Sequence, residues 1–542
     1  MRALALSAVS SYDHGFVVVG FMIFIVVALF LAIMGGPDGD SPEEFAVGSR
    51  TLTPFKNGAA LSGTYLATTV LLNVTATVAL VGFDGITVAV DLLLSLGLLA
   101  VLARPLRQSG GRTLGDLFAL RFSGAAPRIA AAVATLAVSV PFLVIQLSSA
   151  GDVTAQLLGM SSIGAKQTCT VVLGVLVVLC PMLGGMKGHT LVQILSCAVT
   201  VVALGVATLA LLAHFHGDFG ALVSQAAQNS GQHDQYLQPG HAMGTTSLGR
   251  LDHLGLQLAL VLGTPCMPHI LVRIQASGDG AAARRSVRNA CFIVAAVCLT
   301  LVLLGFGAAA VVGGGAIIDA GTDGNSSLLL IAHSLLGGST SALGNLLFTA
   351  VACAAFLSVL SVVGGATLTA ASSIARDVYL HAPRRRQSVP RGEVPVARAA
   401  AAVLGCVGIF IAVVLQGAST AFGSQLTMGI AASSILPALI YSLYWRGYNR
   451  TGLVWTIYGG TILALVLPVF SPRSDTSSTF VPHVDFAWFR FQSPALVSVP
   501  LAFLLGWMGS RMGRSRTTAT DERRRLEADT LQLIGAGAER TG

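Results

Sequence analysis

Charged residues are scarce in this chain of 542 residues: they make up 10% of it, against 54% hydrophobic residues. Soluble domains carry about a quarter charged residues, so this composition excludes an ordinary soluble protein. Apolar runs recur from end to end, and a run of about 20 residues is long enough to cross the ~30 Å hydrocarbon core. The sequence therefore predicts an all-α polytopic membrane protein with about thirteen transmembrane helices between residues 16 and 510.

Lysine is nearly absent, since only three of the 32 basic residues are lysines. The arginines cluster in alternate loops, at 104–128, 273–288 and 376–391, whereas the loops 214–250 and 313–340 carry aspartates and almost no arginine. The positive-inside rule then places the N-terminus outside and the C-terminus in the cytoplasm, with the chain in the plasma (inner) membrane. The formal charge of +8 reflects this topology and predicts no nucleic-acid partner.

Cysteine pairs with metal-binding or redox spacing are also missing. The eight cysteines lie in apolar stretches without CxxC spacing, which predicts buried, free side chains. We expect no cofactor and no metal beyond a possible Na⁺ site. The charged segment 512–542 is expected to be a cytoplasmic tail, and it is too short for a signalling or nucleotide-binding domain.

Two hydroxyl side chains stand out within the apolar run VACAAFLSVLSVVGG (351–365). Ser358 and Ser361 are three residues apart, so they share one face of a helix. Polar groups inside a membrane segment are functional candidates by default, and two hydroxyls on one face can offer oxygens to a cation. Simple hydrogen bonding between helices is the alternative.

Two apolar segments are interrupted by glycine or proline. NGAALSGTYLATT (57–69) contains Gly58 and Gly63, and VLGTPCMPHILVR (261–273) contains Pro265 and Pro268. An unwound backbone persists at membrane depth only where protein or a water-filled cavity satisfies it, and paired interruptions in two halves of a chain indicate the binding site of a secondary transporter. Ordinary proline kinks are the competing interpretation.

Polar side chains are dense beside these interruptions. The N-terminus of a half-helix there would present free N–H groups to an anion, which favours a carboxylate substrate. Interhelical hydrogen bonding could also account for them. The predicted substrate-binding residues are Thr64, Tyr65, Thr68, Thr69, Thr264 and Cys266. Asp91 is the only carboxylate clearly inside a predicted span, although its position near the outer end permits snorkelling.

Several longer motifs carry a family resemblance. They are EEFAVGSRTLTPFKNGAALSG (43–63), RTLGDLFALRF (112–122), LGGMKGHTLVQ (183–193), GTPCMPHILVR (263–273) and SSIARDVY (372–379). Over roughly residues 43 to 450 the chain resembles the sodium:solute symporter family, and its cation/acetate (monocarboxylate) branch in particular.

The resemblance implies a leucine-transporter-type core of two inverted five-helix repeats, at about 57–213 and 252–444, within a transmembrane domain of residues 1–511. It also implies a cation site, formed by the backbone carbonyls of Gly63 and Leu66 and by oxygens of Ser358 and Ser361.

Two departures from the family pattern bear on coupling. Val362 stands where the sugar and proline branches carry a second hydroxyl, which removes one cation ligand. Thr190 stands where sugar-type members carry an aspartate, so Arg273 lacks that ion-pair partner and a second sodium site is not expected.

These observations predict a symporter that imports a small monocarboxylate such as acetate, propionate or pyruvate with Na⁺ or H⁺ by alternating access. We expect no enzymatic activity. Two alternatives stay open: a cation-coupled symporter of another small organic solute, and a transporter-like membrane sensor. The oligomeric state is not predicted.

Overall fold

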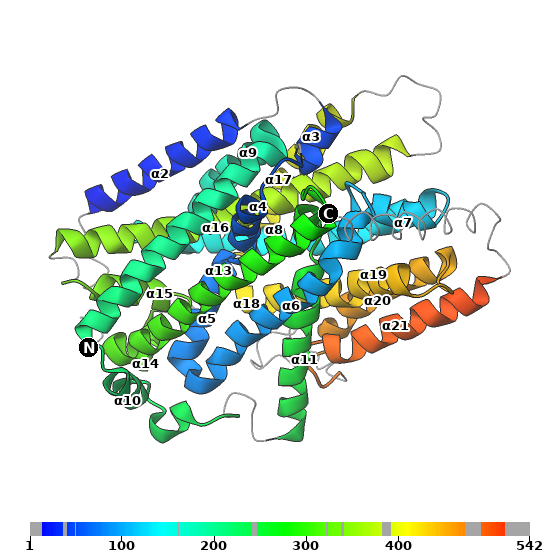
Figure 1. The fold of residues 1–542 in the computed structure, drawn as a ribbon. Helices are drawn as coiled ribbons and strands as arrows, with labels where there is room; N and C mark the ends of the chain where they lie inside the picture. Colours follow the sequence, from blue (N-terminus) through cyan, green and yellow to red (C-terminus); the bar gives the residue numbers. More distant parts are fainter. Residues whose placement is uncertain are drawn as a thin grey trace.

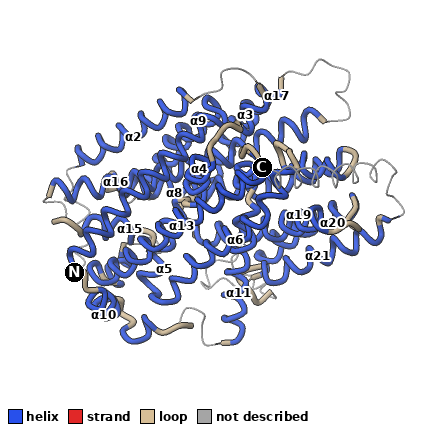
Figure 2. The backbone as a smooth tube through the Cα atoms, in the orientation of Figure 1, coloured by secondary structure: helices blue, strands red, loops and turns tan. Residues whose placement is uncertain are grey.

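The protein is almost entirely helical (Figures 1 and 2). The structure is a computed structural model that describes residues 14–35, 41–48, 50–160, 162–240, 246–320, 324–337, 341–381, 392–471 and 489–514. Within these ranges every secondary-structure element is a helix. The predicted all-α fold is confirmed, whereas most of the predicted tail, from residue 515 on, lies outside the described residues.

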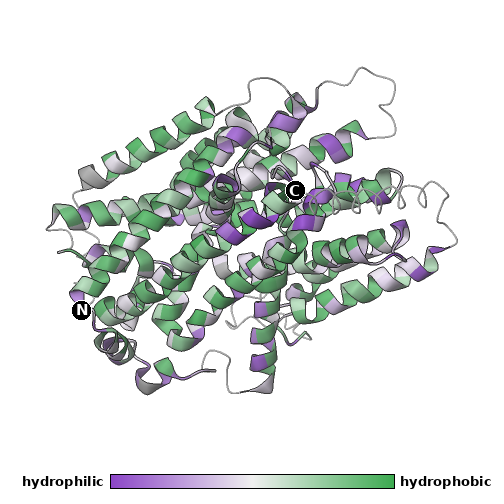
Figure 3. Cartoon of the chain, in the orientation of Figure 1, coloured by the Kyte–Doolittle hydropathy of each residue, from purple (hydrophilic) through white to green (hydrophobic). Residues whose placement is uncertain are grey.

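Ten helical segments of the described chain are long and apolar enough to cross a membrane, and Figure 3 shows their hydrophobic character. They are Thr68–Gln108, Ala125–Leu157, Ile163–His214, Ser247–Gln275, Gly280–Val312, Ala342–Leu380, Glu393–Val414, Phe422–Tyr444, Arg450–Phe470 and Ala495–Met512. A shorter apolar segment, Val18–Met34, belongs to α2 (His14–Met34). A multi-pass membrane protein is thereby confirmed, and the count of thirteen spans stays a prediction.

Two of these ten segments bend at a glycine with positive φ, Gly82 and Gly185. Thr68–Gln108 comprises α5 (Thr68–Val81), the 3₁₀ turn η1 (Gly82–Gly85) and α6 (Ile86–Gln108). α9 (Ile163–His214) is interrupted at Gly185, whose backbone has φ 52° and ψ −158°. Glycine tolerates this left-handed φ without strain, so the Gly-Gly pair in LGGMKG marks the place where one helix ends and the next begins.

The first interrupted segment forms α4 (Pro54–Tyr65) followed by α5, with Leu66 and Ala67 unwound between them. The sequence placed the break at Gly58 and Gly63, and this is wrong because both glycines lie inside α4. They serve close packing instead: a Cβ atom on Gly63 would overlap the carbonyl oxygen of Gln193 in α9.

The second interrupted segment is confirmed where the prolines predicted it. It consists of α11 (Ser247–Gly263), the 3₁₀ turn η3 (Thr264–Cys266), an extended Met267 and α12 (Pro268–Gln275). Pro268 has no N–H and occupies the first turn of α12, where that N–H would have no helical partner anyway. Each predicted repeat therefore begins with a broken helix.

α16 (Ala342–Ser373) lies at the centre of the helical assembly, packed against α9 and α8 (Ala125–Leu157) (Figure 1). Its residues are mostly small, which permits the close approach of neighbouring helices in a membrane. In its most apolar stretch 89% of the residues are buried, compared with 28% for α17 (Glu393–Val414). The face of α16 that carries Ser358 and Ser361 is thus enclosed by other helices.

The remaining helices surround this centre. α2 packs against α9 and α16 on one side, and α20 and α21 pair with each other on another (Figure 1). Their bounds are α3 (Pro42–Val47), α7 (Leu114–Arg121), α10 (Phe219–Asn229), η2 (His233–Leu237), α13 (Gly280–Gly307), η4 (Ala308–Val312), α14 (Gly314–Asp319), α15 (Ser327–Ser334), η6 (Ile374–Leu380), α18 (Thr420–Ile430), η8 (Ala431–Ile435), α19 (Leu436–Tyr444), α20 (Arg450–Val466), η9 (Leu467–Phe470) and α21 (Ala495–Met512).

Two smaller predictions have different outcomes. The apolar segment SLLLIAHSLL (327–336) is too short to span a membrane, which predicts a short external helix. α15 is a helix within this segment, and it packs against α16 and α5. All eight cysteines are free as expected, but Cys406 is exposed on α17 rather than buried. The outer surface of a membrane helix faces lipid, so an apolar side chain loses nothing by lying there.

Candidate cation and substrate site

The first break frees backbone groups in the middle of the molecule. Leu66 (φ −82°, ψ 56°) and Ala67 (φ −59°, ψ 152°) leave the helical conformation, although the Leu66 N–H still donates to the Ser62 carbonyl at 2.8 Å. Carbonyls in the last turn of a helix have no partner within that helix. Gly63 lies in this last turn, so its carbonyl is available to a group outside α4.

Ser361 of α16 contacts this carbonyl directly. Its hydroxyl donates to the Gly63 oxygen at 2.9 Å, and the Ser361 side chain is fully buried. Ser358, one turn earlier and equally buried, donates to the Ala354 carbonyl at 3.0 Å. Two of the four predicted cation ligands therefore touch, with Leu66 at the break beside them and Ser358 on the neighbouring turn of α16.

The threonines that open α5 are tied to two other helices. Thr68 donates its hydroxyl to the Ala355 carbonyl of α16 at 2.6 Å. Thr69 accepts a hydrogen bond from the amide of Gln146 in α8 at 3.0 Å. These side chains hold the N-terminus of α5 in place. The N–H groups of Val70 and Leu71 donate to the Ala67 carbonyl at 2.9 and 3.0 Å, whereas those of Thr68 and Thr69, at the first two positions, have no partner within the helix.

The last two polar residues of α4 are also buried. Thr64 accepts a hydrogen bond from the Gln193 side-chain amide at 2.8 Å, and its residue exposure is 2%. Tyr65, likewise 2% exposed, is one of the largest fully buried side chains. The structure thus gathers Thr64, Tyr65, Thr68 and Thr69 around the first break.

Thr264 and Cys266 lie in the second break. The Thr264 hydroxyl donates to the Leu260 carbonyl within its own helix at 2.7 Å, and Cys266 is fully buried. Their turn, η3, packs against α6 and η8. Among the described residues neither side chain forms a hydrogen bond to the first break, so hydrogen bonds do not join these two parts of the predicted substrate site.

The sequence reasoning did not anticipate the surroundings of Arg273. This arginine of α12 is 1% exposed, and it donates to the Thr190 hydroxyl at 2.9 Å and to the side-chain carbonyl of Gln193. Thr190 was expected only as the residue that replaces the ion-pair partner of Arg273, but its hydroxyl accepts a hydrogen bond from the guanidinium. The spacing of His189 and Gln193 in LGGMKGHTLVQ, four residues apart on one helix face, was the available signal.

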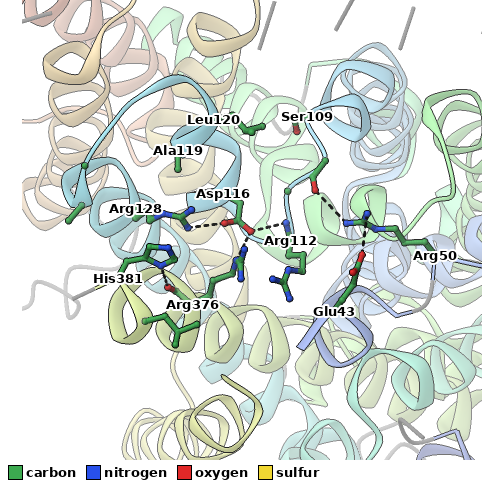
Figure 4. A pocket seen from close by; sticks show the side chains of 15 residues that line it. Glu43, Arg50, Ser109, Arg112, Asp116, Ala119, Leu120, Arg128, Arg376 and His381 are labelled. Atoms are coloured by element: carbon green, nitrogen blue, oxygen red, sulfur yellow. Dashed lines mark hydrogen bonds and ion pairs between the residues drawn. The ribbon is translucent and has the colours of Figure 1, made fainter. Parts of the chain in front are cut away.

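Charged residues meet at the end of the molecule that is predicted to be cytoplasmic. We call this group the ionic network: Arg112, Asp116, Arg128, Arg376, Asp377 and Glu393. Asp116 of α7 pairs with Arg128 of α8 at 2.8 Å and with Arg376 of η6 at 2.6 Å. The network borders a cavity of about 830 Å³ (Figure 4). Its ion pairs tie α7 to α8 and η6, and η6 to α17.

The protonation of Asp116 follows from these partners. Burial alone would raise the pKa of its carboxyl group, but the guanidinium groups of Arg376 and Arg128 outweigh burial, so the pKa lies below its ordinary value. Asp116 is therefore ionised at neutral pH, and it stabilises the network as a carboxylate.

A second set of contacts joins α4, α6 and the end of α12. The Arg107 guanidinium of α6 donates to the carbonyls of Ser277 and Gly278 at 2.6 and 2.8 Å. The Asn57 amide of α4 donates to the Ser277 hydroxyl at 2.9 Å. These helix ends thus form one unit, and the ionic network forms another.

Comparisons with known proteins agree with this geometry. Residues 45–460 match the Sodium:solute symporter family. A monocarboxylic acid transporter of Corynebacterium glutamicum is 32% identical over 96% of this chain and 95% of its own length. An uncharacterized symporter of Bacillus subtilis is 31% identical over 92% of this chain and 95% of its own length.

Two solved structures share the fold. A Na⁺-coupled sialic acid symporter in a substrate-bound, outward-open state aligns with a TM-score of 0.71 at 12% identity, over 92% of this chain and 97% of the other. A nucleobase-cation-symport-1 family transporter in a closed conformation aligns with a TM-score of 0.53 at 11% identity, over 89% of this chain and 97% of the other. The leucine-transporter-type fold that the motifs implied is confirmed. The family match over most of the chain, and the relatives aligned along almost its whole length, show that this multi-pass membrane protein belongs to the sodium:solute symporter family and is a cation-coupled solute symporter.

Proposed function

We propose that this symporter imports a small monocarboxylate such as acetate, propionate or pyruvate together with Na⁺ or H⁺. The carrying observation is the contact between the Ser361 hydroxyl and the Gly63 carbonyl at the first break. Backbone carbonyls at the C-terminal ends of half-helices coordinate the coupling cation in secondary transporters, and the Ser361 hydroxyl can add a second oxygen beside the Gly63 carbonyl. Leu66 and Ser358 complete the proposed set of ligands.

The proposal of a carboxylate substrate is supported by the opening turn of α5. The N–H groups of Thr68 and Thr69, which have no partner within the helix, and the positive dipole end favour an anion, and the two threonines add hydroxyls there. The Corynebacterium glutamicum relative is named as a monocarboxylic acid transporter, which favours the same class of substrate. In this proposal Thr64, Tyr65, Thr264 and Cys266 complete the substrate-binding set.

The proposed site offers the cation few oxygens, because Val362 supplies no hydroxyl. A cation held by two carbonyls and two serines would need water or a substrate oxygen to complete its shell. We therefore propose that uptake depends at least partly on the proton gradient. Asp91, His269 and the carboxylate of the substrate are the candidate proton carriers.

The test is uptake of radiolabelled acids into proteoliposomes that contain the purified protein. An inward Na⁺ gradient and an inward proton gradient are imposed separately, with the membrane potential clamped by K⁺ and valinomycin. We expect acetate, propionate and pyruvate to be taken up and to compete with one another, and glucose and proline not to compete. Efficient competition by glucose would contradict the assignment of the substrate.

Collapse of the pH gradient with nigericin in K⁺ medium addresses the ion. A fall in uptake under a constant Na⁺ gradient is the expected result. Uptake that remains undiminished and strictly dependent on Na⁺ would assign the coupling to sodium alone. Protein-free liposomes provide the control for passive diffusion of the protonated acids.

A further inference from the structure

Arg273 carries a charge in the interior without a carboxylate beside it. It is 1% exposed, and its partners among the described residues are the Thr190 hydroxyl, the Gln193 side-chain carbonyl and the Met186 sulfur. Its Nε atom is buried without a partner. A guanidinium group stays protonated in proteins, so all of these acceptors are neutral while the donor is a cation.

Such an arrangement is costly in a medium of low polarity. Removing one partner of a buried ion pair is strongly destabilising, because the remaining charge is then uncompensated. The half-buried arginines of the ionic network, Arg128 and Arg376, each have a carboxylate oxygen within 2.8 Å. Arg273 has only neutral partners among the described residues, and a bound anion would supply the missing negative charge.

The neighbours of Arg273 are suited to an anion. We define the Arg273 cluster as Arg273 and His269 of α12 together with His189, Thr190 and Gln193 of α9, all of them at most 4% exposed. His189 Nε2 and His269 Nδ1 are buried without partners. A Cβ atom on Gly365 of α16 would meet His189 Nε2, the Gln193 amide and the Cβ of His269 at 3.3 to 3.7 Å.

The cluster is formed by two of the motifs noted in the sequence. LGGMKGHTLVQ supplies His189, Thr190 and Gln193, and GTPCMPHILVR supplies His269 and Arg273, which lie four residues apart on one face of α12. The cation site accounts for none of these side chains.

Gln193 connects the cluster to the first break. Its side-chain carbonyl accepts from Arg273, while its amide donates to the Thr64 hydroxyl at 2.8 Å and lies 3.5 Å from the Ser361 carbonyl. An anion that paired with Arg273 would compete with Gln193 for the guanidinium. Because Gln193 contacts both Thr64 and Ser361, binding of the anion would also change the contacts of these two residues, which lie beside the proposed cation site.

We propose that the Arg273 cluster is a further binding site for the carboxylate of the transported acid, in addition to the opening turn of α5, with Arg273 as the counter-charge that no side chain supplies. The inference rests on the proposed function for the identity of the anion. In this proposal Arg273 contacts the substrate directly. Thr190 is a neutral residue, so unlike an aspartate it does not pair with the guanidinium charge, which stays available to the substrate.

Thr190→Asp is the decisive substitution, because it places a carboxylate where the Thr190 hydroxyl now accepts from Arg273 at 2.9 Å. The internal ion pair should displace the substrate, and we expect the KM for acetate to rise by about tenfold to a hundredfold, the range for a lost charge-assisted hydrogen bond. Thr190→Asn is the matched comparison, of similar size without the charge, and its KM should rise much less than that of Thr190→Asp, because its neutral side-chain oxygen accepts from Arg273 without pairing its charge. A wild-type KM in Thr190→Asp would overturn the proposal.

Charge selectivity provides a readout that a purely structural role would not change. Acetate and acetamide have similar shapes but differ in charge. The inhibition constant of acetamide divided by that of acetate, both measured against uptake of labelled acetate, therefore reports recognition of the negative charge. This ratio should fall by about tenfold or more in Thr190→Asp and in Arg273→Gln, and it should be largely kept in Arg273→Lys. An unchanged ratio in both Thr190→Asp and Arg273→Gln would refute the role of Arg273.

The wild-type protein gives a measurement that does not depend on the folding of a variant. In detergent, propionate should raise the Tm in a concentration-dependent way, and isosteric propionamide should not, because a ligand that binds only the folded state stabilises it. Equal effects of the two compounds would overturn the proposal. Failure of wild-type proteoliposomes to take up any labelled monocarboxylate would instead contradict the proposed function, whereas stabilisation by propionate would still support the anion site.

Discussion

Ser361→Ala is the sharpest test of the cation site. The Ser361 hydroxyl is fully buried and donates to the Gly63 carbonyl at 2.9 Å, so the substitution removes one proposed ligand and leaves a second ligand without its donor. In the absence of a cation, an unsatisfied buried carbonyl costs about 1–3 kcal/mol of folding stability. A modest fall in Tm is therefore expected.

The effect on transport should be larger and of a different kind. An interaction with a charged group is worth about 1.5–3 kcal/mol. At about 1.4 kcal/mol for each factor of ten, the cation concentration for half-maximal uptake should rise by roughly tenfold to a hundredfold. The measurement is initial uptake of labelled acetate in proteoliposomes as external Na⁺, and separately external pH, is varied.

Two further serines of α16 make this experiment specific. Ser358→Ala should raise the cation requirement less, because the Ser358 backbone carbonyl remains as a possible ligand. Ser372→Ala is the matched control, since the Ser372 hydroxyl is buried without a partner and its loss removes no contact. If Ser361→Ala is well expressed and keeps the wild-type dependence on both Na⁺ and pH, Ser361 only joins two helices and the cation site lies elsewhere.

Two other predictions concern packing and charge. Gly63→Ala should abolish uptake and lower the yield of folded protein, because the added methyl group would overlap the Gln193 carbonyl; wild-type expression and uptake would refute that close contact. The stability contributed by Asp116 should be fully present above its ordinary pKa of about 4 and should be lost as the pH falls through the lowered pKa of the folded state. Asp116→Asn should mimic the protonated form, with a lower Tm at neutral pH and little further loss on acidification; a variant with the wild-type Tm at pH 7 would show that the pairs with Arg376 and Arg128 contribute nothing.

The sequence predicted the second break better than the first, for a covalent reason. Pro265 and Pro268 both lack N–H groups and stand three residues apart, so a continuous helix through the pair is strongly disfavoured. Gly58 and Gly63 only permit a break, and in α4 both are helical because they make room for neighbouring helices. The unwound residue, Leu66, has no local signal, since its conformation is set by the packing of α4 and α5 against α16.

The candidate site was predictable in part. A shared helix face places Ser358 and Ser361 together, and the contact of Ser361 with Gly63 could then be expected only from the family resemblance. The environment of Arg273 could not be expected in the same way. It joins residues about 80 positions apart in the chain, and only the folded arrangement of α9 and α12 brings Thr190 to the guanidinium.

The hydrogen bonds around the first break set the scale of the energy that separates the conformations of this transporter. The contacts of Gly63, Thr64, Thr68 and Thr69 with α8, α9 and α16 are all made between neutral groups. Each is worth about 1 kcal/mol net. Replacing these hydrogen bonds by bonds to water or to other protein groups therefore changes the free-energy difference between two conformations by only a few kcal/mol. A change from 1:99 to 99:1 in the populations of two states requires about 5.5 kcal/mol of differential binding. One cation and one solute can supply that amount. Because the contacts at the centre are weak and neutral, binding of these two ligands can determine which conformation of the symporter is populated.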